Sequence, residues 1–366
     1  MDSKDEIKSY GLFATLVCTM IGIGIFSYPR ELAELVNNDG WIVTIISGLI
    51  YMIIASLIYK VCYLNEFKPF DELVKENVGN FIGNLILTFY AIYILMSASV
   101  QVRSFVEVVK KYLLEKTPTE FLIIATILVA AYIIRVGLSN LVRFNEVSFF
   151  IMFIPVVFIL IVLLKGSDFT NLLPVFQNKP IEYIKALSQS LLSFAGIEIL
   201  FLLLPFVKNK YTANKASIKA IGFTTIFYGV INIFCIAILS REETKKLLWP
   251  TISMITSIDI PGLFVERWEG VVMALWILFF FTTFINSYYF SCNLIKDTFK
   301  LQDIRLSILI SMPLIYIMAL FPKNLYVVRF FTKYILRPLI VLTAIVLPLL
   351  FYFIGKVKLR RRDRKK

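Results

Sequence analysis

Long apolar stretches dominate this chain and constrain its fold more than any other feature. About ten stretches of roughly 17–25 mostly apolar residues can be marked, and each is long enough to cross the ~30 Å hydrocarbon core of a bilayer as a helix. In lipid, backbone polar groups need internal partners, and helices provide them within one segment. The sequence therefore predicts an all-α integral membrane protein whose residues 1–366 form a single transmembrane domain.

The expected spans follow one another with short connections. They cover residues 10–37, 40–64, 81–114, 121–136, 145–164, 181–207, 218–239, 265–294, 306–321 and 335–354, and the last two carry the fewest polar residues. An amphipathic element at 67–79 has apolar residues at helical spacing, so we expect it on the inner membrane surface. The connection at 241–265 is expected to form a surface helix or lid over the outer vestibule.

The charge of the chain indicates its orientation. The net charge is +13, and much of it lies in short loops and in the tail at 355–366. Basic residues concentrate on the cytoplasmic side of membrane proteins. We therefore expect both termini and the basic tail to be cytoplasmic, and we expect no nucleic-acid partner.

The residue types present argue against catalysis. The chain has no histidine, which excludes Ser–His and Cys–His catalysis and histidine-ligated zinc or haem. Four scattered cysteines lie in apolar segments without a CxxC pair, so neither a disulfide framework nor a metal site is predicted (Cys18, Cys62, Cys235 and Cys292). We expect no catalytic residue, no cofactor and no enzymatic activity.

The first span is interrupted in its middle. The sequence MIGIGIFSYP at 20–29 contains Gly22 and Gly24, which weaken a helix, and Pro29, which cannot donate a helical hydrogen bond. A broken helix is tolerated in lipid where the freed backbone lines a cavity or is buried in protein. Such a break is typical of a transporter binding site at the bilayer midplane. The alternative is that the glycines let a neighbouring helix pack closely.

The sixth span has a similar interruption. Its sequence SLLSFAGIEILFLLLP places small residues, including Ala195 and Gly196, at mid-span, and Glu198 follows them at membrane depth. An ionisable residue at that depth is costly and indicates a functional site. The alternative is a structural carboxylate that is paired to another helix or kept protonated.

The two interruptions lie five spans apart. Paired broken segments in matching positions of two halves point to an inverted repeat with its site at the breaks. We expect a five-plus-five repeat, with one half at about 10–164, the other at about 181–354, and broken helices 1 and 6.

Two further spans carry polar residues. The eighth span is rich in hydroxyl groups, and Thr282 and Thr283 form a possible ion site, although such groups also bond to their own backbone. The outer end of the third span carries Gln101, Arg103 and Glu107, which form either a helix end in the headgroups or the polar lining of a pathway.

The motifs together resemble a known family. GIGIFSYP in the first span, FAGIEILFLLLP in the sixth and FVERWEG before the eighth are similar to those of spore germination receptor B subunits, within the amino acid–polyamine–organocation transporter superfamily. The resemblance covers nearly the whole chain. It implies a germinant pocket between spans 1 and 6 for an amino acid or similar nutrient. It also implies an A subunit and a lipoprotein C subunit as partners in the spore inner membrane.

The resemblance also implies which residues bind the ligand. In the superfamily, half-helix amides hold the substrate carboxylate and unwound carbonyls hold its ammonium group. Carried over, the first break supplies Gly22, Ile23, Gly24 and Ile25, and the sixth span supplies Phe194, Ala195, Gly196 and Ile197. Glu198 is a further ligand-binding candidate because of its charge at membrane depth. Ala195 stands where relatives often have a second glycine, which leaves less room. From helix geometry, Tyr93 and Ser97 of the third span, one turn apart, could face the same site.

Two functions remain open at this point. The first is a germinant-sensing receptor subunit, in which ligand binding biases an equilibrium between two states and partner subunits receive the change. The second is a proton- or sodium-coupled amino-acid permease, with Glu198 carrying a proton or Thr282 and Thr283 holding sodium. The fifth span lacks a lysine at its centre, which removes one familiar device for proton coupling.

Overall fold

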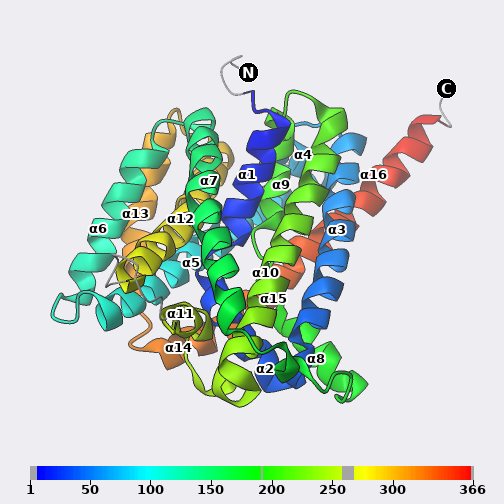
Figure 1. Ribbon diagram of the computed structural model, residues 1–366. Helices are drawn as coiled ribbons and strands as arrows, with labels where there is room; N and C mark the ends of the chain where they lie inside the picture. Colours follow the sequence, from blue (N-terminus) through cyan, green and yellow to red (C-terminus); the bar gives the residue numbers. More distant parts are fainter. Residues whose placement is uncertain (1–5, 191–192, 258–267, 364–366) are drawn as a thin grey trace.

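The computed structural model describes residues 6–190, 193–257 and 268–363, and the regular structure in these ranges is helical (Figure 1). Six of its helical stretches are long and apolar enough to cross a membrane: 28–64, 80–112, 138–166, 210–246, 273–299 and 325–358. Shorter apolar helices lie at 9–20, 119–134, 197–206 and 304–320. With the broken spans counted as single units, they give the expected arrangement of ten spans.

The first half of the chain contains one broken span and four continuous ones. The broken span consists of α1 (Ser9–Met20), η1 (Ile23–Phe26) and α2 (Tyr28–Val36). After η2 (Asn37–Asp39) come α3 (Gly40–Leu64), the short α4 (Phe70–Val78), α5 (Asn80–Tyr112), α6 (Thr119–Ile134) and α7 (Leu138–Leu163). The short turns η3 (Leu164–Gly166) and η4 (Phe169–Leu172) lead into the second half.

The second half repeats this order. Its broken span consists of α8 (Pro180–Ser190), η5 (Ile197–Ile199), α9 (Leu200–Leu203) and η6 (Leu204–Phe206). It continues with α10 (Lys210–Lys246), α11 (Pro250–Thr256), α12 (Trp268–Phe299) and α13 (Ile304–Leu320). The last span combines α14 (Leu325–Phe331), η7 (Thr332–Leu336), α15 (Arg337–Val341), η8 (Leu342–Val346) and α16 (Leu347–Asp363). Helix α1 begins and α16 ends at the same end of the bundle (Figure 1).

Both breaks fall where the sequence places small residues. Helix α1 ends at Met20, and Gly22 is extended, with φ −122° and ψ −147°. Pro29 lies in the first turn of α2, where its missing N–H costs no helical hydrogen bond. In the sixth span Gly196 has φ +106°, a conformation that favours glycine. Local sequence thus accounts for the two interruptions.

Helices α2 and α8, one from each broken span, are joined by a hydrogen bond. The Tyr28 hydroxyl lies 2.6 Å from Ser190 Oγ and 3.0 Å from Thr44 Oγ1. Nearby, the buried Asp39 carboxylate accepts hydrogen bonds from the Tyr183 hydroxyl and the Asn178 amide, both at 2.6 Å. Side-chain hydrogen bonds therefore join α2 to both α3 and α8.

Several predicted boundaries differ from the structure. Span 5 begins at Leu138, seven residues before the predicted start at 145, because Gly137 at φ +98° starts the helix there. Span 7 begins at Lys210, where Asn209 accepts hydrogen bonds from two helix amides, and it bends at Ser240, next to its predicted end at 239. Span 10 begins at Leu325, ten residues before the predicted start at 335, although charged residues occupy its first turns.

The predicted surface element at 67–79 packs differently from expectation. Helix α4 turns its apolar face onto protein: Phe70, Leu73 and Val74 are buried, and the Phe70 ring lies 4.9 Å from that of Phe201. Protein, rather than membrane lipid, therefore covers this face of α4. In the connection after span 7, α11 packs against α10 and α12, and most of its side chains are buried. The rest of the predicted surface helix or lid, residues 258–267, lies outside the described ranges.

Candidate functional site

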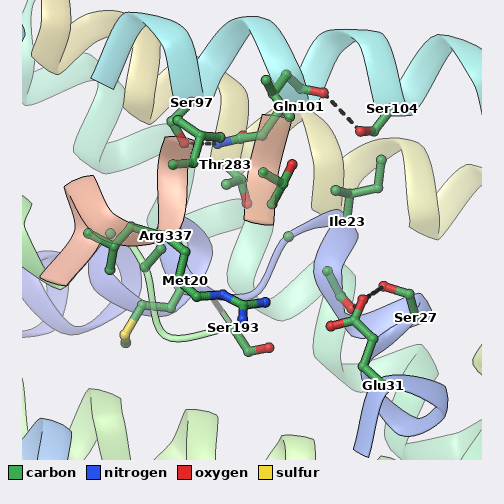
Figure 2. A pocket seen from close by; sticks show the side chains of 18 of the residues that line it. Met20, Ile23, Ser27, Glu31, Ser97, Gln101, Ser104, Ser193, Thr283 and Arg337 are labelled. Atoms are coloured by element: carbon green, nitrogen blue, oxygen red, sulfur yellow. Dashed lines mark hydrogen bonds between the residues drawn. The ribbon is translucent and has the colours of Figure 1, made fainter. Parts of the chain in front are cut away.

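A cavity of about 510 Å³ lies at the two breaks. Its walls come from both broken spans, α5, α10, α12 and the start of the last span (Figure 2). A cavity of this size, with a few convergent polar groups, is typical of a small-molecule site.

The first break contributes backbone to this cavity. Gly22, Ile23 and Gly24 line it. A Cβ atom on Gly24 would meet nothing within 4 Å, whereas one on Gly22 would lie 2.6 Å from Thr283 Oγ1. The two glycines therefore serve different purposes: Gly24 leaves open space, and Gly22 permits close packing against α12. The alternative of close helix packing therefore applies to Gly22, while the binding role of Gly24 stays a prediction.

The sixth break closes the cavity from the other side. Ser193, Ala195 and Gly196 line it. A Cβ atom on Gly196 would lie 2.8 Å from Thr19 Cγ2, so the two breaks contact each other here. The small residues therefore allow the unwound backbone of the two broken spans to meet.

Glu198 lies at the inner end of the cavity and is 3% exposed. Its Oε1 accepts a hydrogen bond of 2.6 Å from the Tyr93 hydroxyl on α5, and its Oε2 accepts one of 2.9 Å from the Gly196 amide. The Tyr90 hydroxyl donates to its backbone oxygen at 3.2 Å. Glu198 is thus paired to another helix, as the structural interpretation expects, and it also borders the cavity.

Helix α5 supplies a polar stripe. Ser97, Gln101 and Ser104 line the cavity, and the Gln101 amide donates to Ser97 Oγ at 3.3 Å (Figure 2). Arg103 turns away from the cavity, because it pairs with Glu107 at 2.6 Å and donates to the Lys323 carbonyl. Gln101 therefore lines the cavity, whereas Arg103 makes a structural contact.

The two threonines of the possible ion site face different ways. Thr283 lines the cavity, and its Oγ1 lies 2.9 Å from the Cys18 carbonyl and 3.4 Å from the Ile21 carbonyl of the first break. Thr282 Oγ1 instead bonds to carbonyls of its own helix and lies 3.8 Å from Met152 Sδ. Both hydroxyl groups contact carbonyls of their own helix, but only Thr283 also contacts carbonyls of the first span.

A buried amide pair supports the first break from behind. Asn145 of α7 donates to Asn286 Oδ1 of α12 at 2.8 Å, and Asn286 donates to Thr19 Oγ1 at 2.9 Å. Both amides are fully buried. Helices α1, α7 and α12 are therefore tied at the level of the cavity.

Three predicted ligand-binding residues point away from the cavity. Ile25 and Ile197 are buried in the hydrophobic core, and the Phe194 ring stacks on Tyr51 at 5.0 Å. Together with Thr282, these residues do not line the cavity. In an unwound segment successive side chains point in different directions, so a contiguous motif cannot face one cavity with every residue.

Charged residues of the last span also line the cavity, and they are not among the residues predicted from the sequence. Arg329, Lys333 and Arg337 line it from the last span. Their spacing of four residues places them on one helix face, and this signal was available in the sequence. The predicted start of the span at 335 places Arg329 and Lys333 in a loop, where this helical spacing would have no meaning.

Comparison with known proteins identifies the family. A family model described as "Spore germination protein" matches residues 6–328. Spore germination protein A2 of Bacillus subtilis is 32% identical over 364 residues, which covers 98% of this chain and 97% of that protein. Spore germination protein GerLB of Bacillus cereus is 30% identical over 371 residues, at 97% and 96% coverage.

A solved structure agrees in fold. Mhp1, a nucleobase-cation-symport-1 family transporter, in a closed conformation with bromovinylhydantoin bound, matches with a TM-score of 0.66 at 11% identity, over 92% of this chain and 75% of that one. At this identity the likeness concerns the fold. It agrees with the five-plus-five arrangement and the two broken helices. The chain is a multi-pass membrane protein with a transporter fold, and it belongs to the spore germination protein family.

Proposed function

We propose that this protein is a subunit of a nutrient germinant receptor, and that it binds a small nutrient such as an amino acid in the cavity between the two broken spans. The observation that carries the proposal is the cavity itself: about 510 Å³, bordered by the unwound backbone at Gly22–Gly24 and by Ala195 and Gly196. The sequence similarity to spore germination proteins supports the biological role.

The proposed signal is a shift between two arrangements of the bundle. A ligand biases such an equilibrium only by its different affinity for the two states. Here the cavity touches both broken spans, which are joined through Tyr28 and Ser190. A nutrient that prefers one arrangement would therefore move α2 and α8 together. An A subunit and a lipoprotein C subunit in the spore inner membrane would receive the change, and both termini would be cytoplasmic.

The alternative is a proton- or sodium-coupled amino-acid permease. One observation favours it: Thr283 Oγ1 and the carbonyls of Cys18 and Ile21 lie together beside the first break. Oxygen atoms of this kind are the ligands of hard cations, and unwound carbonyls coordinate the coupling ion in transporters of this design. Glu198 would be the corresponding carrier of a proton.

Reconstitution in proteoliposomes separates the two functions. A panel of labelled amino acids is offered with and without proton and sodium gradients. Saturable binding without accumulation, lost in Gly196→Leu, is the expected result for a sensor. Gradient-driven accumulation that disappears in Glu198→Gln would overturn the proposal and make the protein a permease.

A further inference from the structure

The outer end of the cavity is cationic. Arg30 of α2 lines it together with Arg329, Lys333 and Arg337 of the last span, against two carboxylates, Glu31 and Glu34. In Figure 2, Arg337 extends from the last span into the cavity, toward the side that carries Glu31.

The two carboxylates are already engaged. Glu31 accepts from Ser27 Oγ at 2.8 Å and from the Gln189 amide at 2.6 Å. Glu34 lies 3.4 Å from Arg30 Nε. On the other side of the cavity, Arg337 donates to Gln189 Oε1 rather than to a carboxylate. Positive charge therefore remains without a matching negative charge among the residues that line this end.

The guanidinium groups have unused donors. Arg337 Nε is buried and has no hydrogen-bond acceptor among the described residues. Arg30 Nε also lacks a hydrogen bond, although it lies in an ion pair with Glu34 and a terminal nitrogen of Arg30 donates to the Leu248 carbonyl at 3.2 Å. Arg329 also lies close enough to interact electrostatically with Arg30, and with Glu31 and Glu34. A buried charged donor without an acceptor is costly, and a carboxylate between guanidinium groups is the ligand that relieves this cost best.

The inner end of the cavity does not suit a ligand carboxylate. The Gly196 amide, a donor at the sixth break, is occupied by Glu198 Oε2 at 2.9 Å. A second carboxylate at this position would be repelled by Glu198. At the sixth break, the Gly196 amide is therefore already occupied by a side chain of the protein itself.

We propose that the ligand of this cavity carries a carboxylate, and that Arg337, with Arg30 and Arg329, binds this group at the outer end. This inference rests on the proposed function, because it names the chemistry by which the proposed nutrient is recognised.

The test is a binding titration on the full-length protein in lipid nanodiscs. The probes are the twenty common amino acids, the carboxamide of each, and succinate, which has carboxylates and no ammonium group. A charge-assisted contact predicts about tenfold or greater loss of affinity when the carboxylate becomes a carboxamide, and a similar loss for the amino acid in Arg337→Gln. The Arg337→Gln change is expected to have little further effect on the affinity for the carboxamide, because the carboxamide lacks the charge-assisted contact with Arg337 from the start.

Matched variants keep the result interpretable. Arg337→Lys retains the charge and is expected to bind more tightly than Arg337→Gln. Lys116→Gln removes an exposed charge from the connection between α5 and α6, outside the cavity, and is expected to bind normally. Size-exclusion profiles and melting temperatures establish that each variant is folded.

The outcomes separate this inference from the proposed function. Amino-acid binding that is lost in Gly196→Leu but unchanged in Arg337→Gln and Arg30→Gln would overturn the arginine site and leave the receptor proposal intact. Succinate binding that depends on Arg337, without binding of any amino acid, would support the carboxylate site and overturn an amino-acid receptor. If neither succinate nor any amino acid binds, both proposals fail.

Discussion

The Tyr93 hydroxyl donates a hydrogen bond of 2.6 Å to Glu198 Oε1, and this contact joins α5 to the sixth break at the inner end of the cavity. The two residues are 105 positions apart in the chain. Both line the cavity, so a ligand that displaces one of them would also move the other.

Tyr93→Phe is expected to lower the free energy of unfolding by roughly 1–2 kcal/mol, the range for interhelical bonds in membranes and for bonds to charged groups. Unfolding in mixed detergent micelles measures the change. Tyr90→Phe is the matched control, because Tyr90 donates to the backbone oxygen of the same glutamate at 3.2 Å, and its loss is expected to be smaller. An equal loss in both variants would show that the hydrogen bond to the carboxylate is no stronger than the one to the backbone oxygen.

Gly196→Ala is expected to abolish ligand binding, because its new Cβ atom would lie 2.8 Å from Thr19 Cγ2. Gly137→Ala is the control: it also introduces strain at positive φ, of at least about 1–2 kcal/mol, but its Cβ atom would meet nothing within 4 Å. Calorimetric titration of both variants measures the difference. Thr19→Ser removes the obstructing methyl group, so the double variant Thr19→Ser/Gly196→Ala is expected to recover part of the binding. Failure of that rescue would argue that strain alone explains the loss.

Alanine substitution of the two glycines in the first break is expected to affect different properties: ligand affinity at Gly24 and stability at Gly22. Gly24→Ala adds a methyl group to open space, so the free energy of unfolding stays within about 0.5 kcal/mol while ligand affinity falls. Gly22→Ala forces a Cβ atom to 2.6 Å from Thr283 Oγ1 and is expected to cost about 1–3 kcal/mol. Thermal unfolding and ligand titration check both effects. Comparable stability of the two variants would contradict this assignment.

The amide pair Asn145–Asn286 is expected to be energetically coupled. Replacing either residue with leucine leaves the other amide buried and without its partner, at a cost of about 1–3 kcal/mol. The double variant is expected to lose less than the sum of the single losses, with a coupling of about 0.5–3 kcal/mol. A double-mutant cycle on the free energy of unfolding measures it. Strict additivity would mean that the two amides do not stabilise each other.

Thr283→Val and Thr282→Val remove the same hydroxyl group from adjacent positions. Only Thr283 contacts the first break, so its variant is expected to lose roughly 1 kcal/mol, whereas Thr282→Val stays within about 0.5 kcal/mol. Sodium is then titrated against both variants and the unmodified protein. A sodium-dependent gain in melting temperature that disappears only in Thr283→Val would favour the permease alternative.

The sequence alone determined the spans and the positions of the two breaks. Apolar length specifies which segments cross the membrane, because hydrocarbon excludes unpaired backbone. Glycine and proline specify where a helix is interrupted, because their backbone preferences are local. Gly22, Gly24 and Gly196 therefore marked the cavity walls before any contact was known.

Tertiary structure decided which side chains face the cavity. Thr282 and Thr283 are neighbours in the chain and both bond to carbonyls of their own helix, yet only Thr283 also faces the first break, because successive helical positions point about 100° apart. The partner of Glu198 and the role of Arg337 likewise depend on how distant helices cross. Residue type and spacing identify candidate groups, but only packing sets which of them meet.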